Sequence, residues 1–305
     1  MPELPEVETV VSELRPKLKN KTIKAIEVRL PKMISIGPRT MPNVRSAKDG
    51  VVGQFVRALV GKKITDIDRR AKLIIIDIEG KYSILIHLKM TGQLIYLSKK
   101  DLAKQVRLLN IENYPKTSLP AKSTHVIFDL SDGSRLFYND MRQFGYLKLV
   151  TDKELPDVKE LNEFGPEPLS KDFTFEVFER LLKRRAKAQV KPWLTDPKII
   201  AGIGNIYSDE ILFFAKIKPT RVIQSLSDFE KTLLFEGIKT ILMDAVKHYG
   251  SSVGDFVRPS GDWGKYGLKH KVYGREGKPC KACGSTIKSI KFNGRTGSFC
   301  PHCQK

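Results

Sequence analysis

Long apolar runs, a targeting segment and internal repeats are all missing from this 305-residue chain, and each absence narrows the class of protein. No apolar stretch approaches the roughly 20 residues of a membrane-spanning helix. The longest, 73–76 and 211–215, have the length of core segments. The first residues carry glutamates without a basic start, so we expect no signal peptide. The sequence therefore predicts a soluble protein of the cytoplasm that is too long for one ordinary domain.

Acidic residues are scarce relative to basic ones. The chain has 54 Lys and Arg against 34 Asp and Glu, a formal net charge of +20. The region from Arg258 to the last residue holds 11 basic and 2 acidic side chains. Such an excess favours a polyanionic partner, because neutralised phosphates release condensed counterions. We expect nucleic acid; a membrane surface is disfavoured because no basic amphipathic helix stands out.

Cysteine is confined to the C-terminal region, where two C-x2-C pairs are separated by sixteen residues. Each pair places two thiolates on one turn, and two such turns complete a tetrahedral zinc shell. Disulfides and a redox C-x-x-C are the alternatives. The absence of a fifth cysteine and of a nearby βαβ pattern favours zinc. The predicted ligands of one structural Zn²⁺ are Cys280, Cys283, Cys300 and Cys303.

The residues between the two cysteine pairs indicate a β-hairpin. The stretch 285–292 leads into Asn293-Gly294, a strong two-residue turn signal. The whole region therefore predicts a small zinc ribbon. His302, inside the second turn, is an alternative ligand, although four thiolates already suffice. Arg295, just past the turn, is well placed to meet a phosphate.

The first half of the chain begins with a helix and continues as strands. Apolar residues from Val7 to Leu18 follow helical spacing, and Pro16 should end or kink that helix. The predicted strands are 72–78 with 82–88, 124–130 with 134–139, 93–97 and 146–150, where the first two pairs flank Glu79-Gly80 and Asp132-Gly133. Many antiparallel strands with short turns indicate a sandwich or barrel. Residues 98–122 are long and polar and predict a surface insertion.

The second half has a helical period. Helices are predicted at 175–183 and 206–214, and the capping box Ser227-Asp-Phe-Glu230 opens a third that should run to about Tyr249, with Gly250 as its stop. The predicted fold class is α+β. We expect an N-terminal sandwich domain over 1–150, a linker over 151–170, a helical domain over 171–270 and the zinc finger over 271–305.

The N-terminal sequence Pro2-Glu3 suggests covalent chemistry. We expect the initiator Met to be removed before a small second residue, exposing a secondary amine. An α-amino group has a pKa near 7.7–8.0, and a position before a helix start would lower it further. Such an amine can form a Schiff base with an aldehyde-like carbon, and Glu3 beside it could carry protons. Read alone, the motif is weak, and an acidic helix cap is the simpler interpretation.

Further motifs change this interpretation. In order and approximate spacing, the chain resembles the bacterial formamidopyrimidine-DNA glycosylases through Pro2-Glu-Leu-Pro-Glu-Val-Glu-Thr9, Arg69-Arg-Ala-Lys72, His87-Leu-Lys-Met-Thr-Gly92, Tyr138-Asn-Asp-Met-Arg-Gln-Phe-Gly145, Ala201-Gly-Ile-Gly-Asn-Ile-Tyr-Ser-Asp-Glu210 and Cys300-Pro-His-Cys-Gln-Lys305. The resemblance covers nearly the whole chain. It implies a monomeric, nucleoid-associated base-excision repair enzyme acting on damaged double-stranded DNA. Such an enzyme would excise oxidised purines and then cut the strand by β,δ-elimination.

The resemblance also implies residue roles. Pro2 would be the nucleophile and Glu3 the proton donor for base release and ring opening. Lys72 would serve as the second proton donor in β-elimination, and Arg295 would act in δ-elimination and clamp phosphate. The implied DNA contacts are His87, the void-filling trio Met90, Arg142 and Phe144, and the phosphate contacts Lys191, Asn205 and Tyr273, while Glu210 supports the site's structure.

The Gly-rich turn Gly202-Ile-Gly-Asn205, between two helices as in the family's helix–two-turns–helix motif, could cradle a phosphate with its backbone amides. The chain departs from the family's pattern at Lys89, Ser123, Met141, Gln143 and Ala186, which puts lesion preference and affinity in question. Two alternatives stay open: an endonuclease VIII-like glycosylase for oxidised pyrimidines, and a catalytically silent zinc-containing DNA-binding protein.

Overall fold

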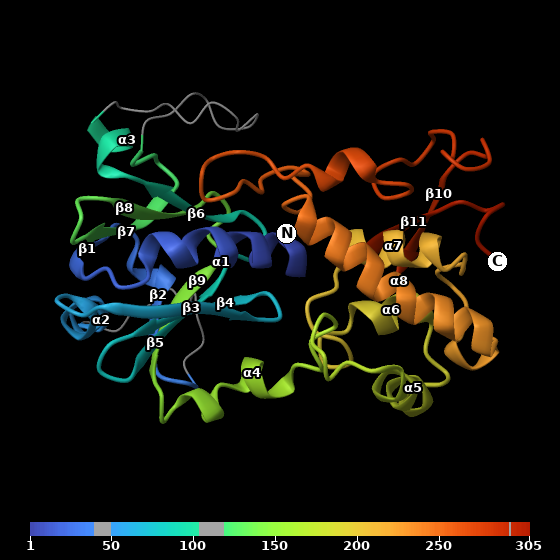
Figure 1. Ribbon diagram of the computed structural model, residues 1–305, viewed down its shortest axis with the longest axis horizontal. Coiled ribbons are helices and arrows are strands. Elements are labelled where there is room, and N and C mark those ends of the chain that lie inside the picture. The colour runs from blue at the N-terminus through green and yellow to red at the C-terminus, as the bar shows by residue number, and fades with distance from the viewer. Residues whose placement is uncertain (40–49, 104–118, 293) are drawn as a thin grey trace. The chain divides into compact units, whose positions relative to one another are not determined.

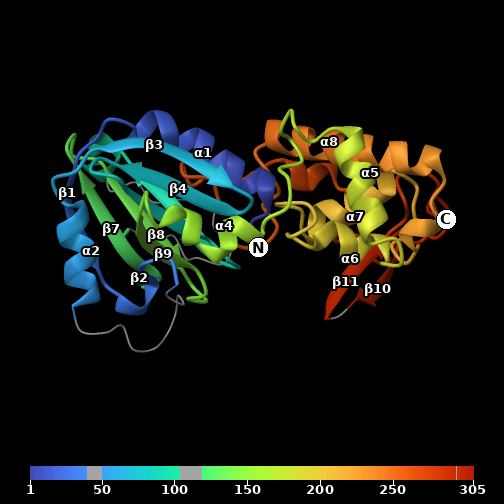
Figure 2. The same ribbon diagram turned by 90° about the horizontal axis from the view of Figure 1, so that it is seen from below.

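The computed structural model describes residues 1–39, 50–103, 119–292 and 294–305. It divides into two compact units (Figures 1 and 2). Unit 1 comprises Met1–Pro2, Glu6–Asn162 and Tyr249–Gly264, and unit 2 comprises Glu3–Pro5, Glu163–His248 and Lys265–Lys305. The units are therefore not continuous in sequence. The N-terminal residues Glu3–Pro5 belong to unit 2, and the later segment Tyr249–Gly264 belongs to unit 1.

Unit 1 contains the predicted N-terminal helix, apart from its first two residues, and two sheets. Helix α1 runs from Leu4 to Leu18, so it passes through Pro16 and ends within the turn that follows it. Its apolar side chains are buried, as the helical spacing predicted. The other helices are α2 (Val51–Leu59), α3 (Lys99–Ala103) and α4 (Lys159–Glu163), the last of which reaches the unit boundary, and two short 3-10 turns are η1 (Pro31–Met33) and η2 (Leu155–Asp157).

The strands confirm the predicted antiparallel sandwich, with one exception. One sheet has the order β1-β7-β8-β6 and the other β2-β9-β5-β4-β3, and only the β2–β9 pair is parallel among the described strands. In the view of Figure 1, β6, β7 and β8 lie above α1 and β3, β4 and β5 lie below it. The strands are β1 (Ile23–Val28), β2 (Ile34–Ile36), β3 (Ile64–Arg70), β4 (Leu73–Ile78), β5 (Tyr82–His87), β6 (Gly92–Leu97), β7 (Thr124–Leu130), β8 (Arg135–Asp140) and β9 (Tyr146–Thr151).

The turn residues explain why the hairpins form where the sequence predicted them. Gly80, between β4 and β5, has φ of +90°, and Gly133, between β7 and β8, has φ of +82°. Both values are easy only for glycine. The Asp132 carboxylate accepts a hydrogen bond from the Ser134 backbone N–H at 3.1 Å and so closes the second turn.

Successive side chains of a strand point alternately into the space between the two sheets and toward the outer faces of the sandwich. In β4, Ile74, Ile76 and Ile78 join the main core with α1, while Leu73 packs in a separate cluster with Leu85. The segment Tyr249–Gly264 belongs to this unit because its side chains and backbone contact it. Phe256 enters the main core, and the Ser251 N–H donates to the Glu6 carboxylate at 2.7 Å.

Unit 2 contains the predicted helices and the zinc ribbon. The capping box at Ser227 and Glu230 is present in both directions. The strands of the ribbon pair antiparallel, and the turn residue Asn293 lies outside the described residues. The elements are α5 (Phe175–Arg184), α6 (Val190–Thr195), α7 (Asn205–Phe214), η3 (Ile223–Ser225), α8 (Asp228–Lys247), η4 (Tyr266–Lys269), β10 (Lys288–Phe292) and β11 (Arg295–Phe299).

Two further predictions concern the polar insertion at residues 98–122 and membrane-spanning helices. The expected insertion 98–122 begins with α3, and its residues 104–118 lie outside the described part of the chain. Among the described residues, no helix is long and apolar enough to cross a bilayer.

Candidate catalytic and DNA-contacting residues

The Glu3 side chain is bound to the start of α7. Its carboxylate accepts hydrogen bonds from the backbone N–H groups of Gly204 at 2.7 Å, Ile206 at 2.8 Å and Tyr207 at 3.4 Å. These are amides that the helix itself leaves without partners, and the positive end of the helix dipole favours a carboxylate there. Glu3 is only 2% exposed. A fixed, buried anion therefore stands directly after Pro2 in the chain.

This arrangement leaves fewer backbone amides for one predicted role. The Gly-rich turn was expected to offer its amides to a phosphate, but two amides of the helix start and that of Gly204 already donate to Glu3. Gly202 has φ of +86°, and a Cβ there would lie 2.7 Å from the Leu4 side chain. The turn is thus shaped to receive the residues that follow Pro2. Pro2 itself is buried, while Met1 is 41% exposed.

Lys72 lies in a two-residue turn between β3 and β4. Arg70 and Leu73 face each other across the hairpin, so Ala71 and Lys72 form its tip. Ala71 has φ of +55°, a conformation that costs a non-glycine residue energy and recurs at functional sites. Arg69 braces the same turn, because its guanidinium binds the Glu8 carboxylate at 2.6 Å and the Ala71 carbonyl at 3.3 Å.

His87 is brought close to Lys72 by strand register, because His87 pairs with Leu73 across β4 and β5. Burial, with Lys89 and Lys72 adding to it, lowers the pKa of His87 to about 3. Its Nδ1 accepts the Lys89 N–H at 3.0 Å. The imidazole is therefore neutral at pH 7, and its Nε2 carries the proton that it can donate.

The three residues of the expected wedge are exposed on unit 1. Met90 is 39% exposed on the turn between β5 and β6, and Phe144 is 49% exposed on the loop after β8. The Arg142 guanidinium carbon lies 4.9 Å from the centre of the Phe144 ring. Single exposed apolar side chains are common on protein surfaces. Here, however, two of them stand on loops that are hydrogen-bonded to each other, and one lies against a guanidinium group.

Lys191, which was predicted to contact phosphate, forms its hydrogen bonds within the protein and lines a cavity together with Arg295. It is 2% exposed, and its Nζ forms an ion pair with the fully buried Asp209 and a 3.1 Å hydrogen bond with Ser208. The other Asp209 oxygen accepts the Ser298 N–H of β11 at 2.9 Å. Burial raises the pKa of Asp209 to about 6, against the opposing effect of Lys191. This pair, which sequence reasoning missed although Asp209 stood in a quoted motif, joins α6, α7 and the ribbon.

The other expected contacts of unit 2 gather around α7 and the ribbon. The Asn205 side-chain amide donates to the Thr296 carbonyl at 2.8 Å. Glu210 is buried and accepts the backbone N–H groups of Lys271, Val272 and Tyr273, which fits the expected supporting role. Arg295 begins β11 and, with Phe292, lines a cavity of about 270 Å³.

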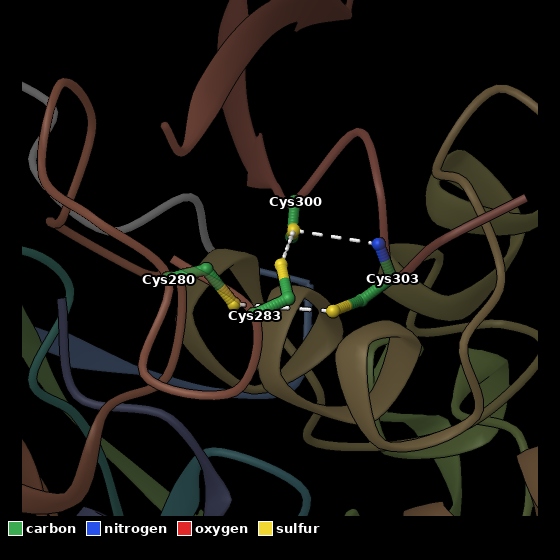
Figure 3. Close-up of side chains that lie close together, drawn as sticks. All are labelled: Cys280, Cys283, Cys300 and Cys303. Carbon is green, nitrogen blue, oxygen red and sulfur yellow. Dashed lines mark hydrogen bonds between the residues drawn. The ribbon is translucent and has the colours of Figure 1, made fainter. Parts of the chain in front are cut away.

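The four cysteines converge on one point (Figure 3). All four Sγ atoms lie within 4.8 Å of one another; Cys280 and Cys303 are 4.0 Å apart and Cys283 and Cys300 3.5 Å apart. A tetrahedron with Zn–S bonds of about 2.3 Å has S···S edges of about 3.8 Å. Backbone amides of Ala282 and Cys303 point at the sulfurs of Cys280 and Cys300, each at 3.4 Å. The residues therefore fit one structural Zn²⁺ with four thiolates, and His302 is outside the cluster.

The zinc ribbon is tied to the helical part of unit 2 by the last residues of the chain. Gln304 accepts the Cys300 N–H at 2.8 Å and donates to the Ile217 carbonyl at 2.9 Å. The Lys305 N–H donates to Lys216 at 3.0 Å, and the Lys305 carbonyl accepts from Lys218 at 2.9 Å.

Comparison with known proteins places these features in a family. The formamidopyrimidine-DNA glycosylase N-terminal domain matches residues 1–147, the H2TH domain of the same glycosylase 164–257, and the zinc finger found in FPG and IleRS 277–305. Among similar proteins are the formamidopyrimidine-DNA glycosylases of Pelotomaculum thermopropionicum, 40% identical over 100% of this chain and 99% of that one, and Carboxydothermus hydrogenoformans, 41% identical over 100% of both.

Solved structures give the same result. Lactococcus lactis Fpg in complex with abasic-site DNA has a TM-score of 0.81 and 32% identity over 99% of both chains. MutM (Fpg) of Thermus thermophilus has a TM-score of 0.79 and 34% identity over 99% of this chain and 98% of that one. The identities and coverage show that the chain belongs to the formamidopyrimidine-DNA glycosylase family.

Proposed function

We propose that this protein is a bifunctional DNA glycosylase and AP lyase of base-excision repair that excises oxidised purines through a Schiff base on Pro2. The observation that carries the proposal is the Glu3 carboxylate, fixed by three backbone amides directly after Pro2 in a chain that matches the family over its whole length.

The chemistry begins with the secondary amine that removal of Met1 would expose. Its lone pair attacks C1′ of the damaged nucleotide and the bond to the base breaks. The Glu3 carboxylate takes up the proton that the amine loses and passes it to the leaving base. Opening of the sugar ring gives an iminium ion. This cation acidifies the C2′ proton, and its loss expels the 3′ phosphate (β-elimination). Loss of a further sugar proton then expels the 5′ phosphate (δ-elimination).

The remaining residues are assigned to particular steps. Lys72, on its braced turn, handles the proton of the β-elimination, and Arg295 of the ribbon binds the phosphate that leaves in the δ-elimination. Extruding a base leaves a void that must be filled, and the exposed Met90, Arg142 and Phe144 suit that wedge role. His87, Asn205 and Tyr273 contact the backbone. Zinc supplies the rigidity of the ribbon and takes no part in the reaction.

We propose damaged double-stranded DNA as the partner and the cytoplasm, at the nucleoid, as the location of a monomer. The net charge of +20 supports binding to a polyphosphate. Lactococcus lactis Fpg was solved with abasic-site DNA and with FAPY-dG DNA, which supports the assignment of the substrate class.

Borohydride trapping tests the covalent step. The protein is mixed with a duplex carrying 8-oxoguanine opposite cytosine, and borohydride reduces the iminium ion to a stable amine. We expect a protein–DNA adduct whose N-terminal peptide, by mass spectrometry, lacks Met1 and carries the sugar on Pro2. Pro2→Gly should lose most of the adduct while keeping DNA affinity. An undiminished adduct on another residue would contradict the proposal.

A lesion panel tests the substrate. Duplexes with 8-oxoguanine or formamidopyrimidine, the two oxidised purines, should be cleaved faster than a duplex with thymine glycol, an oxidised pyrimidine. The panel needs the pyrimidine because Lactococcus lactis Fpg was also solved with DNA containing an oxidised pyrimidine. Faster cleavage of thymine glycol would favour the endonuclease VIII-like alternative.

A further inference from the structure

We propose that Asp140, acting through Thr91, is a positioning residue that holds the two wedge-bearing loops of unit 1 in one fixed arrangement for base extrusion. Neither residue is part of the wedge. The proposal rests on the assigned wedge role of Met90, Arg142 and Phe144, and it adds the element that keeps these side chains in register.

The two loops meet at one buried carboxylate. Asp140 is the last residue of β8 and is fully buried, and Thr91 is 1% exposed. The Thr91 hydroxyl donates a hydrogen bond to Asp140 Oδ1 and accepts the Arg142 N–H at 2.9 Å. Asp140 Oδ2 accepts the Gly145 N–H at 2.7 Å. The carboxylate thus binds both the turn that carries Met90 and the loop that carries Arg142 and Phe144.

The backbone of Asp140 is fixed as well. Its N–H donates to the Ser123 carbonyl at 2.9 Å, and its carbonyl lies 2.7 Å from His125 Nε2. Burial lowers the pKa of His125, so the ring is neutral at pH 7 and donates from Nε2. The main chain of Asp140 therefore cannot shift toward either loop without breaking further hydrogen bonds in the buried interior.

Two glycines allow the loops to approach so closely. A Cβ at Gly145 would overlap the Tyr138 hydroxyl and lie 3.1 Å from Asp140 Oδ2. A Cβ at Gly92 would lie 2.7 Å from the Leu88 Cα and overlap the Leu88 carbonyl. Both loops therefore form tight turns next to the carboxylate. The exposed wedge side chains extend from these anchored turns.

The consequence for function is pre-organisation. Side chains that must enter a DNA stack lose less entropy if they are already held in position. Because Met90 and Phe144 hang on loops anchored by the same carboxylate, their separation stays constant while DNA enters. Asp140 and Thr91 touch no reacting atom in the proposed chemistry, so they should affect extrusion of a stacked base and not the elimination steps.

The test compares two substrates in single-turnover kinetics. One duplex carries 8-oxoguanine opposite cytosine, whose base must be unstacked; the other carries an abasic site, which has no base to extrude. Thr91→Val removes the bridging hydroxyl and preserves side-chain shape. We expect its excision of 8-oxoguanine to slow about tenfold, the size of one hydrogen bond lost, while strand cleavage at the abasic site changes less than about twofold, too small to reflect a lost hydrogen bond.

Two further variants keep the result interpretable. Thr91→Ser retains the hydroxyl and should recover most of the excision rate. Asp140→Asn retains one carbonyl oxygen and should resemble Thr91→Val. A 2-aminopurine placed beside the lesion reports extrusion directly, and its fluorescence rise should slow in step with excision.

Equal slowing on both substrates, or normal fluorescence with Thr91→Val, would overturn the proposal, because either result would mean a general structural role or none. Failure of the underlying function would look different, since the unmodified protein would then fail to cut the 8-oxoguanine duplex at all.

Discussion

Gly202 shows what one residue contributes to the site. Its φ of +86° and the Leu4 side chain 2.7 Å from the position of an added Cβ leave no room for alanine. We expect Gly202→Ala to lower the free energy of unfolding by about 2 kcal/mol, because it combines overpacking with backbone strain. Urea unfolding followed by circular dichroism measures the change.

Gly53 is the matched control for that substitution. It lies inside α2, and an added Cβ would meet only the flexible end of the Arg57 side chain, at 3.1 Å. Alanine in a helix is favoured over glycine by about 1 kcal/mol. Gly53→Ala should therefore leave stability unchanged or raise it, and an equal loss in both variants would contradict the argument from Gly202.

For single residues, the sequence predicted which side chains belong to the candidate site better than it predicted what those side chains bind. The Pro2-Glu3 start and the four cysteines stood out because their chemistry is local: a terminal amine, and thiolates two residues apart. The partner of Glu3 could not be predicted, since the amides of Gly204 and Ile206 lie about 200 residues away in the chain. The ion pair of Lys191 was not predictable either, because its partner Asp209 reaches it only through tertiary packing.

Helix α8 offers a test at the scale of an element. Ser227 accepts the Glu230 N–H, and the Glu230 side chain accepts the Ser227 N–H at 2.8 Å. Removing the hydroxyl in Ser227→Ala should cost about 1 kcal/mol of stability because a helix amide loses its partner. Ser227→Asp keeps an acceptor and should cost much less in the same denaturation experiment. A similar loss in both variants would contradict the role given to the side-chain acceptor of the cap.

The buried pair of Lys191 and Asp209, which joins two helices to the ribbon, predicts a pH dependence. The pKa of Asp209 is raised to about 6, so its contribution to stability falls as pH rises toward 6 and is constant above. Lys191→Met removes the ammonium and raises that pKa further, so the variant should go on losing stability above pH 6. We expect the gap to widen from pH 6 to pH 8, reaching about 3–5 kcal/mol.

Urea unfolding of both proteins at pH 6, 7 and 8 measures this gap. Lys198→Met is the matched control, because Lys198 pairs with Glu163 on the surface with its side chain 60% exposed. That change should cost no more than about 1 kcal/mol at any of the three pH values. A gap for Lys191→Met that is independent of pH would contradict a titrating Asp209.

Individual elements were predictable where local signals were strong. The hairpins around Gly80 and Gly133, the capping box at Ser227 and the amphipathic α1 all rest on spacing and turn chemistry within a few residues. The parallel pairing of β2 with β9 was not predictable, since the two strands are separated by most of unit 1 and carry no mark of direction. The exact end of α1 was not predictable either: Pro16, predicted to end or kink the helix, is followed by two more helical residues, up to Leu18.

For the molecule as a whole, removal of zinc should unfold part of unit 2 and leave unit 1 folded. Chelation should release the ribbon and abolish DNA binding, because β10 and β11 depend on the thiolate cluster. Amide exchange in β4 and β5 of unit 1 should stay slow, since their contacts lie within that unit. Cys283→Ser should behave like the chelated protein, whereas His302→Ala should keep its zinc. Loss of protection throughout unit 1 would show that the two units fold together.

The hydrogen bonds of the final residues bear on how the protein can be handled in the laboratory. Both backbone groups of Lys305 and both ends of the Gln304 amide are engaged with unit 2. An affinity tag fused there would have to leave from residues that are hydrogen-bonded to unit 2, and a tag before Pro2 would mask the proposed amine nucleophile. A cleavable N-terminal fusion that regenerates proline after proteolysis is therefore the safer purification strategy.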